Sequence, residues 1–237
     1  FSPIMNMWCK SEYFQPFRRD SNDVIARISP IALKIDDLNE AIKLAKTTTE
    51  FTHKDPESIK GAEVFTDALW KAARGRSKDD IRFAVENDYG IDLNIPEQDL
   101  KSILMGAVKE DVIINGEPTG EVYYRDTGKI DYSTMNTLTA ALKCFLDGNS
   151  FEDIVRRAVA LGGDSTTIAS VAGALAQAMH KDMPQEILSQ CEKNIPSDLK
   201  NIMDSFEMSL SRRAAQEPER KVSQTNELAF HVIKKPD

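Results

Sequence analysis

The chain has 237 residues, 41% of them hydrophobic, and a formal net charge of −8 at pH 7. This length suits one or two globular domains. A folded chain of this length buries about 70% of the surface that it exposes when unfolded, so it needs no disulfide framework. The acidic balance argues against nucleic-acid and membrane-surface binding, because both need concentrated positive charge. No apolar run could span a bilayer and no signal peptide is visible. The three cysteines lie far apart and form no CxxC pair, so we expect a reducing compartment and a cytoplasmic protein.

The N-terminal half begins irregularly and then becomes helical. Residues 1–30 show no clean period, but a helix is predicted from Asp36 or Asp37 to about Phe51. The segment Asp55-Pro56-Glu57 is a strong helix start, with a capping aspartate, a proline at the first position and an acid in the first turn. Gly75 ends that helix.

The rest of the chain is also mostly helical. Ser77 opens a helix that closes near Gly90, and residues 91–132 are the least regular part, with a short helix predicted near Gln98–Val108. The later predicted helices are Thr134–Leu146, Ser150–Leu161, one after Asp164, and one after each of Pro184 and Pro196. We therefore predict an all-α domain over residues 1–213 and a charged tail over 214–237, in which LAFHVI could form a short strand.

The stretch GGDSTT before the helix at 165–180 gathers many oxygen ligands. Gly162 and Gly163 allow a sharp turn, and Asp164 stands at a helix N-cap. Three hydroxyl side chains follow, those of Ser165, Thr166 and Thr167. Ordinary capping chemistry explains this pattern. It is the explanation that the spacing alone favours, and a hard-cation or phosphate site at a helix N-terminus is the alternative.

The same stretch resembles the C-terminal signature of the ADP-ribosylglycohydrolase family, Gly-Gly-Asp-x-Asp-Thr followed by an alanine- and glycine-rich helix. Upstream, NTLTAALKCFLDGNSFEDIVRRAV is similar to the family's preceding helix pair. The segment from RISPIALK to LWKAARG resembles its middle section, and SNDVIARISP occupies the place of a glycine-rich loop. The resemblance covers roughly residues 8–210, in four segments that follow one another in the family's order.

This resemblance implies a compact multi-helix bundle that uses two magnesium ions to remove ADP-ribose from proteins or small acceptors. It places the metal ligands at Asp164, Thr166 and Thr167. It places ADP-ribose near a second set of residues, Asn22, Arg27, His53, Gly162, Gly163 and Ser165. A structural role for His53 at its helix-entry turn stays open, and no catalytic residue is assigned. The implied partners are ADP-ribose or an ADP-ribosylated protein, with a further protein partner also possible.

Several positions depart from the family pattern. Thr166 replaces an aspartate expected to bridge both metals, which removes one negative charge and one strong ligand. No Thr-Asp-Asp motif, the family's other ligand set, occurs in the chain. In the glycine-rich loop Ser21, Asp23 and Val24 replace two glycines and a serine, and Asp23 brings negative charge toward a pyrophosphate.

Two explanations fit these departures, and they are compatible. The chain begins at Phe1, so the N-terminal part of the family fold that carries the missing motif could be absent. Alternatively, the protein is a catalytically silent relative, a pseudoenzyme. We expect impaired or lost magnesium-dependent hydrolysis on a scaffold that still binds ADP-ribose or a protein. The other possibilities are an active hydrolase with a compensated metal site and a helical protein-interaction module.

Overall fold

The structure is a computed structural model that describes residues 9–10, 16, 18–114 and 117–211. The chain divides into two compact units, Phe1–Pro184 and Gln185–Asp237. In the described part of the chain no helix combines the length and the apolar character needed to cross a membrane.

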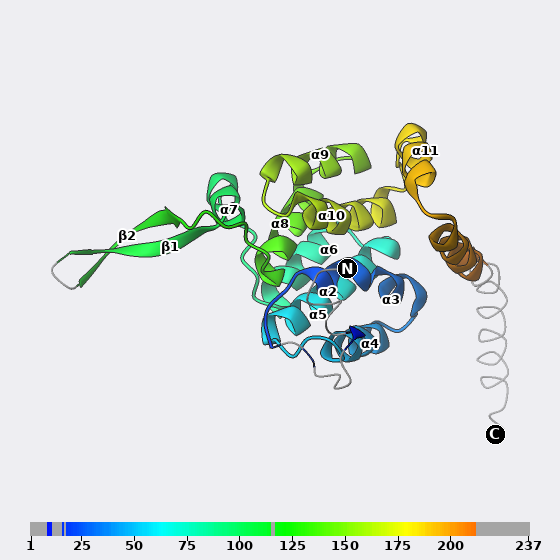
Figure 1. Cartoon of the computed structure of the whole chain (residues 1–237), viewed down its shortest axis with the longest axis horizontal. Coiled ribbons are helices and arrows are strands. Elements are labelled where there is room, and N and C mark those ends of the chain that lie inside the picture. Colours follow the sequence, from blue (N-terminus) through cyan, green and yellow to red (C-terminus); the bar gives the residue numbers. More distant parts are fainter. Residues whose placement is uncertain (1–8, 11–15, 17, 115–116, 212–237) are drawn as a thin grey trace, which may run out of the picture. The chain divides into compact units, whose positions relative to one another are not determined.

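The first unit is a helical body with one β-hairpin (Figure 1). Its elements are α2 (Asp23–Arg27), α3 (Ser29–Lys34), α4 (Leu38–Glu50), α5 (Pro56–Ala73), α6 (Lys78–Phe83), the π-helix η1 (Ala84–Asp88), α7 (Glu97–Leu104), β1 (Ala107–Ile114), β2 (Glu117–Asp126), α8 (Thr134–Asp147), α9 (Phe151–Leu161) and α10 (Ser165–His180). The prediction of an all-α fold is confirmed.

The helix starts follow the capping chemistry that the sequence predicts. Asp37 caps α4 by accepting a hydrogen bond from the Glu40 amide at 2.8 Å. Asp55 caps α5 by accepting from two amides of its first turn. Ser77 and Asp80 form a reciprocal capping box at α6. Such contacts need only three or four consecutive residues, which explains why local sequence predicts them.

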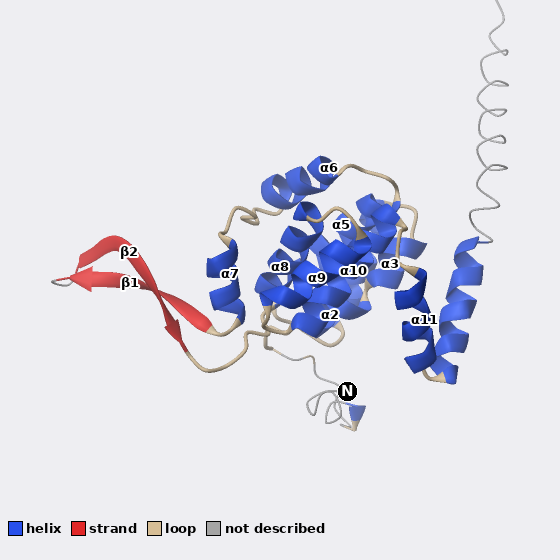
Figure 2. Cartoon of the chain, turned by 90° about the horizontal axis from the view of Figure 1, so that it is seen from above, coloured by secondary structure: helices blue, strands red, loops and turns tan. Residues whose placement is uncertain are grey.

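Helices α5, α8 and α10 form the centre of the body (Figures 1 and 2). Each contributes large side chains that are fully or almost fully buried: Phe65 and Leu69 from α5, Leu138 and Phe145 from α8, and Ile168 and Leu175 from α10. Burying one such side chain contributes roughly 1.5–3 kcal/mol. This packing fixes the N-termini of α8 and α10, which carry the candidate site.

Helices α2 and α3 were not predicted. They have five and six residues, too few for a helical period to show in the sequence. They are held by tertiary packing instead, since Val24, Ile25 and Ala32 are completely buried and both helices contact α5. This packing places the residue before α2, Asn22, inside the body.

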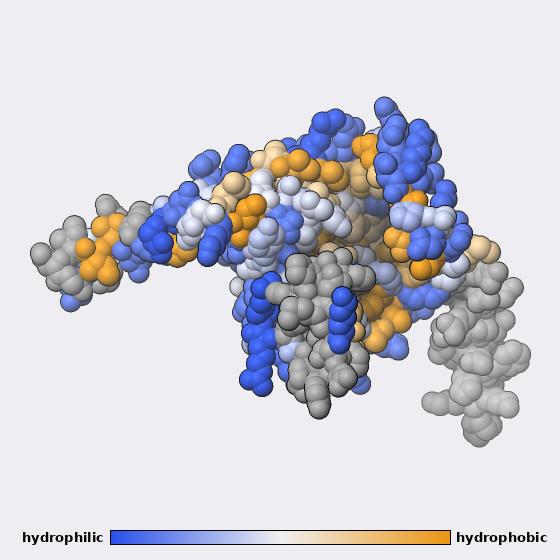
Figure 3. Space-filling model, viewed as in Figure 1, coloured by the Kyte–Doolittle hydropathy of each residue, from blue (hydrophilic) through white to orange (hydrophobic). Residues whose placement is uncertain are grey.

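The irregular region contains an antiparallel hairpin that extends from the end of α7 away from the helical body (Figure 2). Helix α7 begins near the predicted residue but ends at Leu104, short of Val108, because Gly106 adopts φ +93° and redirects the chain. A run of β-branched residues follows in β1, and the Glu110–Arg125 ion pair at 2.6 Å links the two strands. Apolar side chains are exposed along this hairpin (Figure 3), among them Val108 and Ile113.

The second unit contains α11 (Gln185–Asn194) and a helix over residues 197–211. Both begin directly after the prolines that predicted them, Pro184 and Pro196. The predicted domain boundary after residue 213, the charged tail and the LAFHVI strand lie outside the described residues and stay predictions.

Candidate functional site

The loop between α9 and α10 is shaped by its two glycines. Gly162 and Gly163 have φ values of +84° and +63°, in the region that favours glycine. A Cβ on Gly163 would lie 2.8 Å from the Leu104 Cβ and 2.9 Å from the Leu104 carbonyl oxygen. The Gly163 amide also donates to the Met105 sulfur at 3.2 Å. The glycine pair therefore lets the loop pack directly against the end of α7.

Asp164 caps α10 and has both carboxylate oxygens engaged. Oδ1 accepts from the Thr167 amide at 3.3 Å, and Oδ2 accepts from the Thr167 hydroxyl at 2.7 Å. Oδ2 also accepts from Asn22 Nδ2 at 2.9 Å. These donors and the positive end of the α10 dipole compensate the negative charge. The Asp164 carboxylate thus ties the helix start to a segment far away in the sequence.

Asn22 is the other half of this tie. Its side chain is buried, and Nδ2 donates to the Thr137 hydroxyl at 3.0 Å as well as to Asp164. Its backbone amide donates to the Tyr132 carbonyl at 3.1 Å. Asn22 makes no side-chain cap bond to α2. The Asn22 side-chain amide therefore joins the N-terminal segment to both α8 and α10.

Two carboxylates organise the segment before α8, and sequence reasoning did not assign either to the site. Both Asp20 oxygens accept from the Thr134 amide at 3.1 Å, and Oδ1 also accepts from the hydroxyls of Thr134 and Ser58. Asp131 accepts from the Ser133 hydroxyl at 2.7 Å and from Asn136 Nδ2 at 2.9 Å. The only signal for Asp20 was its place directly before the segment, from Ser21 onward, that resembles the family's glycine-rich loop.

Arg27 and His53 meet on a third residue. His53 Nδ1 lies 2.9 Å from the Thr52 hydroxyl, and Arg27 Nη2 donates to the same hydroxyl. His53 is buried, with 2% of its surface exposed. Burial, followed by the nearby Arg27 charge, lowers the pKa of His53. The structure thus brings Arg27 together with His53, and Asn22 together with Asp164.

The three hydroxyls after Asp164 differ in environment. Thr167 is half-buried and uses its hydroxyl in the cap of α10. Ser165 is half-buried and Thr166 is exposed to solvent in the first turn of the helix. Thr166 therefore faces the solvent side of the turn, with a neutral oxygen where the family signature carries a carboxylate.

The described residues do not fit a pair of magnesium ions. Magnesium prefers several oxygen ligands, and two dications need several negative charges. At the start of α10 the described chain supplies one carboxylate, Asp164, whose oxygens already accept hydrogen bonds. Among the residues that the structure describes, no group of three or more His, Cys, Asp or Glu side chains could hold a metal ion. We therefore assign no chemical step to a metal here.

A family model and a solved structure both match this chain and agree on its family resemblance and fold. A search of curated protein sequences finds no match. One solved structure, described as an "ADP-ribosylglycohydrolase-related protein complex", matches with a TM-score of 0.60 at 23% sequence identity. The match covers 88% of this chain and 66% of that chain, so this chain spans just under two thirds of the other's length, and at this identity the likeness shows the fold alone. The ADP-ribosylglycohydrolase family model matches residues 5–219, and the chain therefore belongs to the ADP-ribosylglycohydrolase family.

Proposed function

We propose that this chain binds ADP-ribose or an ADP-ribosylated protein on the family scaffold, and that its magnesium-dependent hydrolysis is lost or strongly impaired. The family acts on ADP-ribosylated substrates and is generally metal-dependent. The observation that carries the proposal is the state of Asp164, whose carboxylate accepts three hydrogen bonds as a helix cap and an interhelical tie.

Charge supports the loss of hydrolysis. Thr166 removes one negative charge from the family signature, and hard-cation affinity follows the number of charged ligands. The neighbouring carboxylates of Asp20 and Asp131 are also engaged, at the start of α8. A metal at Asp164 would have to displace donors from Asn22 and Thr167 and then bind a single charged ligand.

The exposed guanidinium of Arg27 supports retained binding of ADP-ribose. Arg27 is exposed and its guanidinium is held in place by the Thr52 hydroxyl, an arrangement that suits a phosphate oxygen. Asp23 is exposed in the first turn of α2 and opposes this attraction. We therefore expect ADP-ribose to bind weakly, and we expect binding to weaken further in an Arg27→Gln variant.

The first experiment separates binding from hydrolysis. ADP-ribose at a hundred times its dissociation constant should stabilise the protein by about 2.7 kcal/mol, measured as a shift in the unfolding transition. Release of ADP-ribose from an arginine- or serine-linked substrate should stay at background with and without magnesium. Magnesium-dependent release that scales with protein concentration and is lost in Asp164→Asn would establish an active hydrolase instead. An absence of ADP-ribose binding together with an absence of hydrolysis would favour a protein-interaction module.

The second experiment restores the missing charge. Thr166→Asp should raise magnesium affinity, because it places a second carboxylate beside Asp164. Thr48→Asp is the matched control, since it adds the same charge at an exposed position of α4. Equal magnesium titrations for the two variants would contradict the correspondence between Thr166 and the bridging aspartate of the family.

A further inference from the structure

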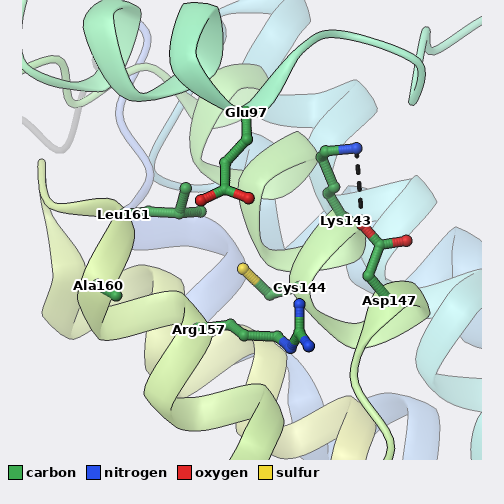
Figure 4. A pocket seen from close by; sticks show the side chains of 7 residues that line it. All are labelled: Glu97, Lys143, Cys144, Asp147, Arg157, Ala160 and Leu161. Atoms are coloured by element: carbon green, nitrogen blue, oxygen red, sulfur yellow. Dashed lines mark ion pairs between the residues drawn. The ribbon is translucent and has the colours of Figure 1, made fainter.

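A small cavity of about 110 Å³ lies where α7, α8 and α9 meet (Figure 4). It is lined by Glu97 from α7, by Lys143, Cys144 and Asp147 from α8, and by Arg157 and Leu161 from α9. None of these residues belongs to the predicted ADP-ribose or metal set. By this measure one water needs about 15 Å³, so the cavity has room for a ligand of about seven heavy atoms.

Two carboxylates and two cationic side chains line this cavity, so its charged groups are balanced in number. Lys143 pairs with Asp147 at 3.6 Å, within α8. Arg157 uses its Nε to pair with Asp153 at 3.0 Å, which leaves the two terminal nitrogens of the guanidinium for another acceptor. Glu97 makes no ion pair with a described residue. One carboxylate and one guanidinium edge are therefore available.

These two available groups come from different walls. Figure 4 shows the Glu97 carboxylate reaching into the cavity from α7, while the Arg157 guanidinium approaches from α9. The Cys144 thiol lies on the α8 wall between them, and only 5% of Cys144 is exposed. Leu161 completes an apolar part of the lining. A ligand in this cavity thus meets an anion on one side, a cation on the other and a small apolar surface between.

We propose that this cavity binds a small zwitterion of the free α-amino acid class, of about the size of alanine or serine. The ligand ammonium pairs with Glu97, its carboxylate pairs with the open edge of Arg157, and its short side chain contacts Cys144 and Leu161. A ligand with a net charge would leave one wall unpaired, whereas a zwitterion matches both. The inference is independent of the function proposed above.

Binding at this cavity is non-covalent. Burial, and next the Glu97 charge, raises the pKa of the Cys144 thiol to about 12. The thiol is therefore protonated at neutral pH, and a thiol is a poor nucleophile compared with its thiolate. Cys144 contributes contact area to the cavity and takes part in no bond-making step.

The test is a calorimetric and NMR titration of the full chain with L-alanine, propionate and ethylamine. We expect a dissociation constant for alanine on the order of 0.1–1 mM, from its six heavy atoms. Propionate lacks the ammonium and ethylamine lacks the carboxylate, so each should bind at least about tenfold more weakly, as expected for the loss of a charged hydrogen bond. No alanine binding at about 20 mM, or equal binding of propionate, would overturn the proposal.

Variants assign the binding to this cavity. Glu97→Gln and Arg157→Gln should each weaken alanine binding about tenfold or more, because each removes one charged partner. Arg156→Gln is the matched control, since Arg156 neighbours Arg157 on α9 but its side chain is 77% exposed and pairs with Glu152. All three positions are exposed enough for the variants to fold, which the unfolding transition checks. A dissociation constant that changes less than twofold in both cavity variants would place the binding elsewhere.

Discussion

Replacing Asn22 by alanine tests whether the tie between the N-terminal segment and α10 stabilises the fold. The change removes the Nδ2 donor while leaving the backbone bond to the Tyr132 carbonyl in place. It leaves one Asp164 oxygen and the Thr137 hydroxyl without this donor, and Thr137 is completely buried. Because Asn22 makes no side-chain cap bond to α2, the loss reports the tertiary tie and not the capping of that helix.

The expected loss follows from the two hydrogen bonds. A hydrogen bond to a charged group contributes about 1.5–3 kcal/mol, and one between neutral groups contributes about 1 kcal/mol. The Asn22→Ala variant should therefore lose roughly 2.5–4 kcal/mol of unfolding free energy. Such a loss is a large share of the total stability of a typical domain, which is about 5–15 kcal/mol.

Urea denaturation followed by circular dichroism measures this loss, with the slope m expected to stay constant. Asn87→Ala is the matched control, because Asn87 donates a local hydrogen bond to the Phe83 carbonyl at 2.9 Å and is exposed. We expect a change within about 0.5 kcal/mol for that surface position. Combining Asn22→Ala with Asp164→Ala should give a coupling energy of about 1–2 kcal/mol.

Two results would refute this reasoning. One is a loss of less than about 1 kcal/mol for Asn22→Ala, which would mean that solvent satisfies the groups left behind. The other is an equal effect of Asn22→Ala in the presence and absence of the Asp164 carboxylate, which would mean that the two side chains are not energetically coupled.

Two further predictions concern the loop and the buried histidine. Gly163→Ala should lower the free energy of unfolding by about 1–2 kcal/mol, because alanine disfavours the left-handed conformation at this position. The clash of the new Cβ with Leu104 should lower it by a further ~1–3 kcal/mol, and thermal unfolding measures the sum. Gly75→Ala isolates the first cost, because it has φ +74° and no atom within 4 Å of its Cβ; equal losses in the two variants would show that the clash is relieved at no cost. Burial, followed by the Arg27 charge, lowers the pKa of His53 in the folded protein below its unfolded value of about 6.5. The neutral imidazole therefore contributes its full stabilisation above about pH 6.5, and this stabilisation is lost as the pH falls through the lower folded pKa. His53→Gln should therefore flatten the decline of stability below about pH 6.5, and an unchanged decline would assign it to other groups.

Local sequence determined most of the helix boundaries. The caps at Asp37, Asp55 and Ser77 each connect a side chain with an amide at most three residues away, so the chain carries the whole interaction within one short segment. The prolines at 184 and 196 act in the same local way. The resemblance of several segments to one family also implied a metal-binding role for Asp164 and an ADP-ribose-binding role for Asn22, and both roles stay predictions.

Only the tertiary structure decided which hydrogen bonds Asn22 and Asp164 make. Asn22 and Asp164 are 142 positions apart, and Asp20 and Thr134 are 114 apart, so no local pattern records that these pairs share hydrogen bonds. Helix α2 likewise depends on burial of Val24 and Ile25 against the body and shows no period of its own. The sequence determined that a capping aspartate begins α10. The packing of α2 and α8 against that helix start decided that its carboxylate is compensated by Asn22 and Thr167, because hydrogen bonds between distant segments exist only once the core has brought them together.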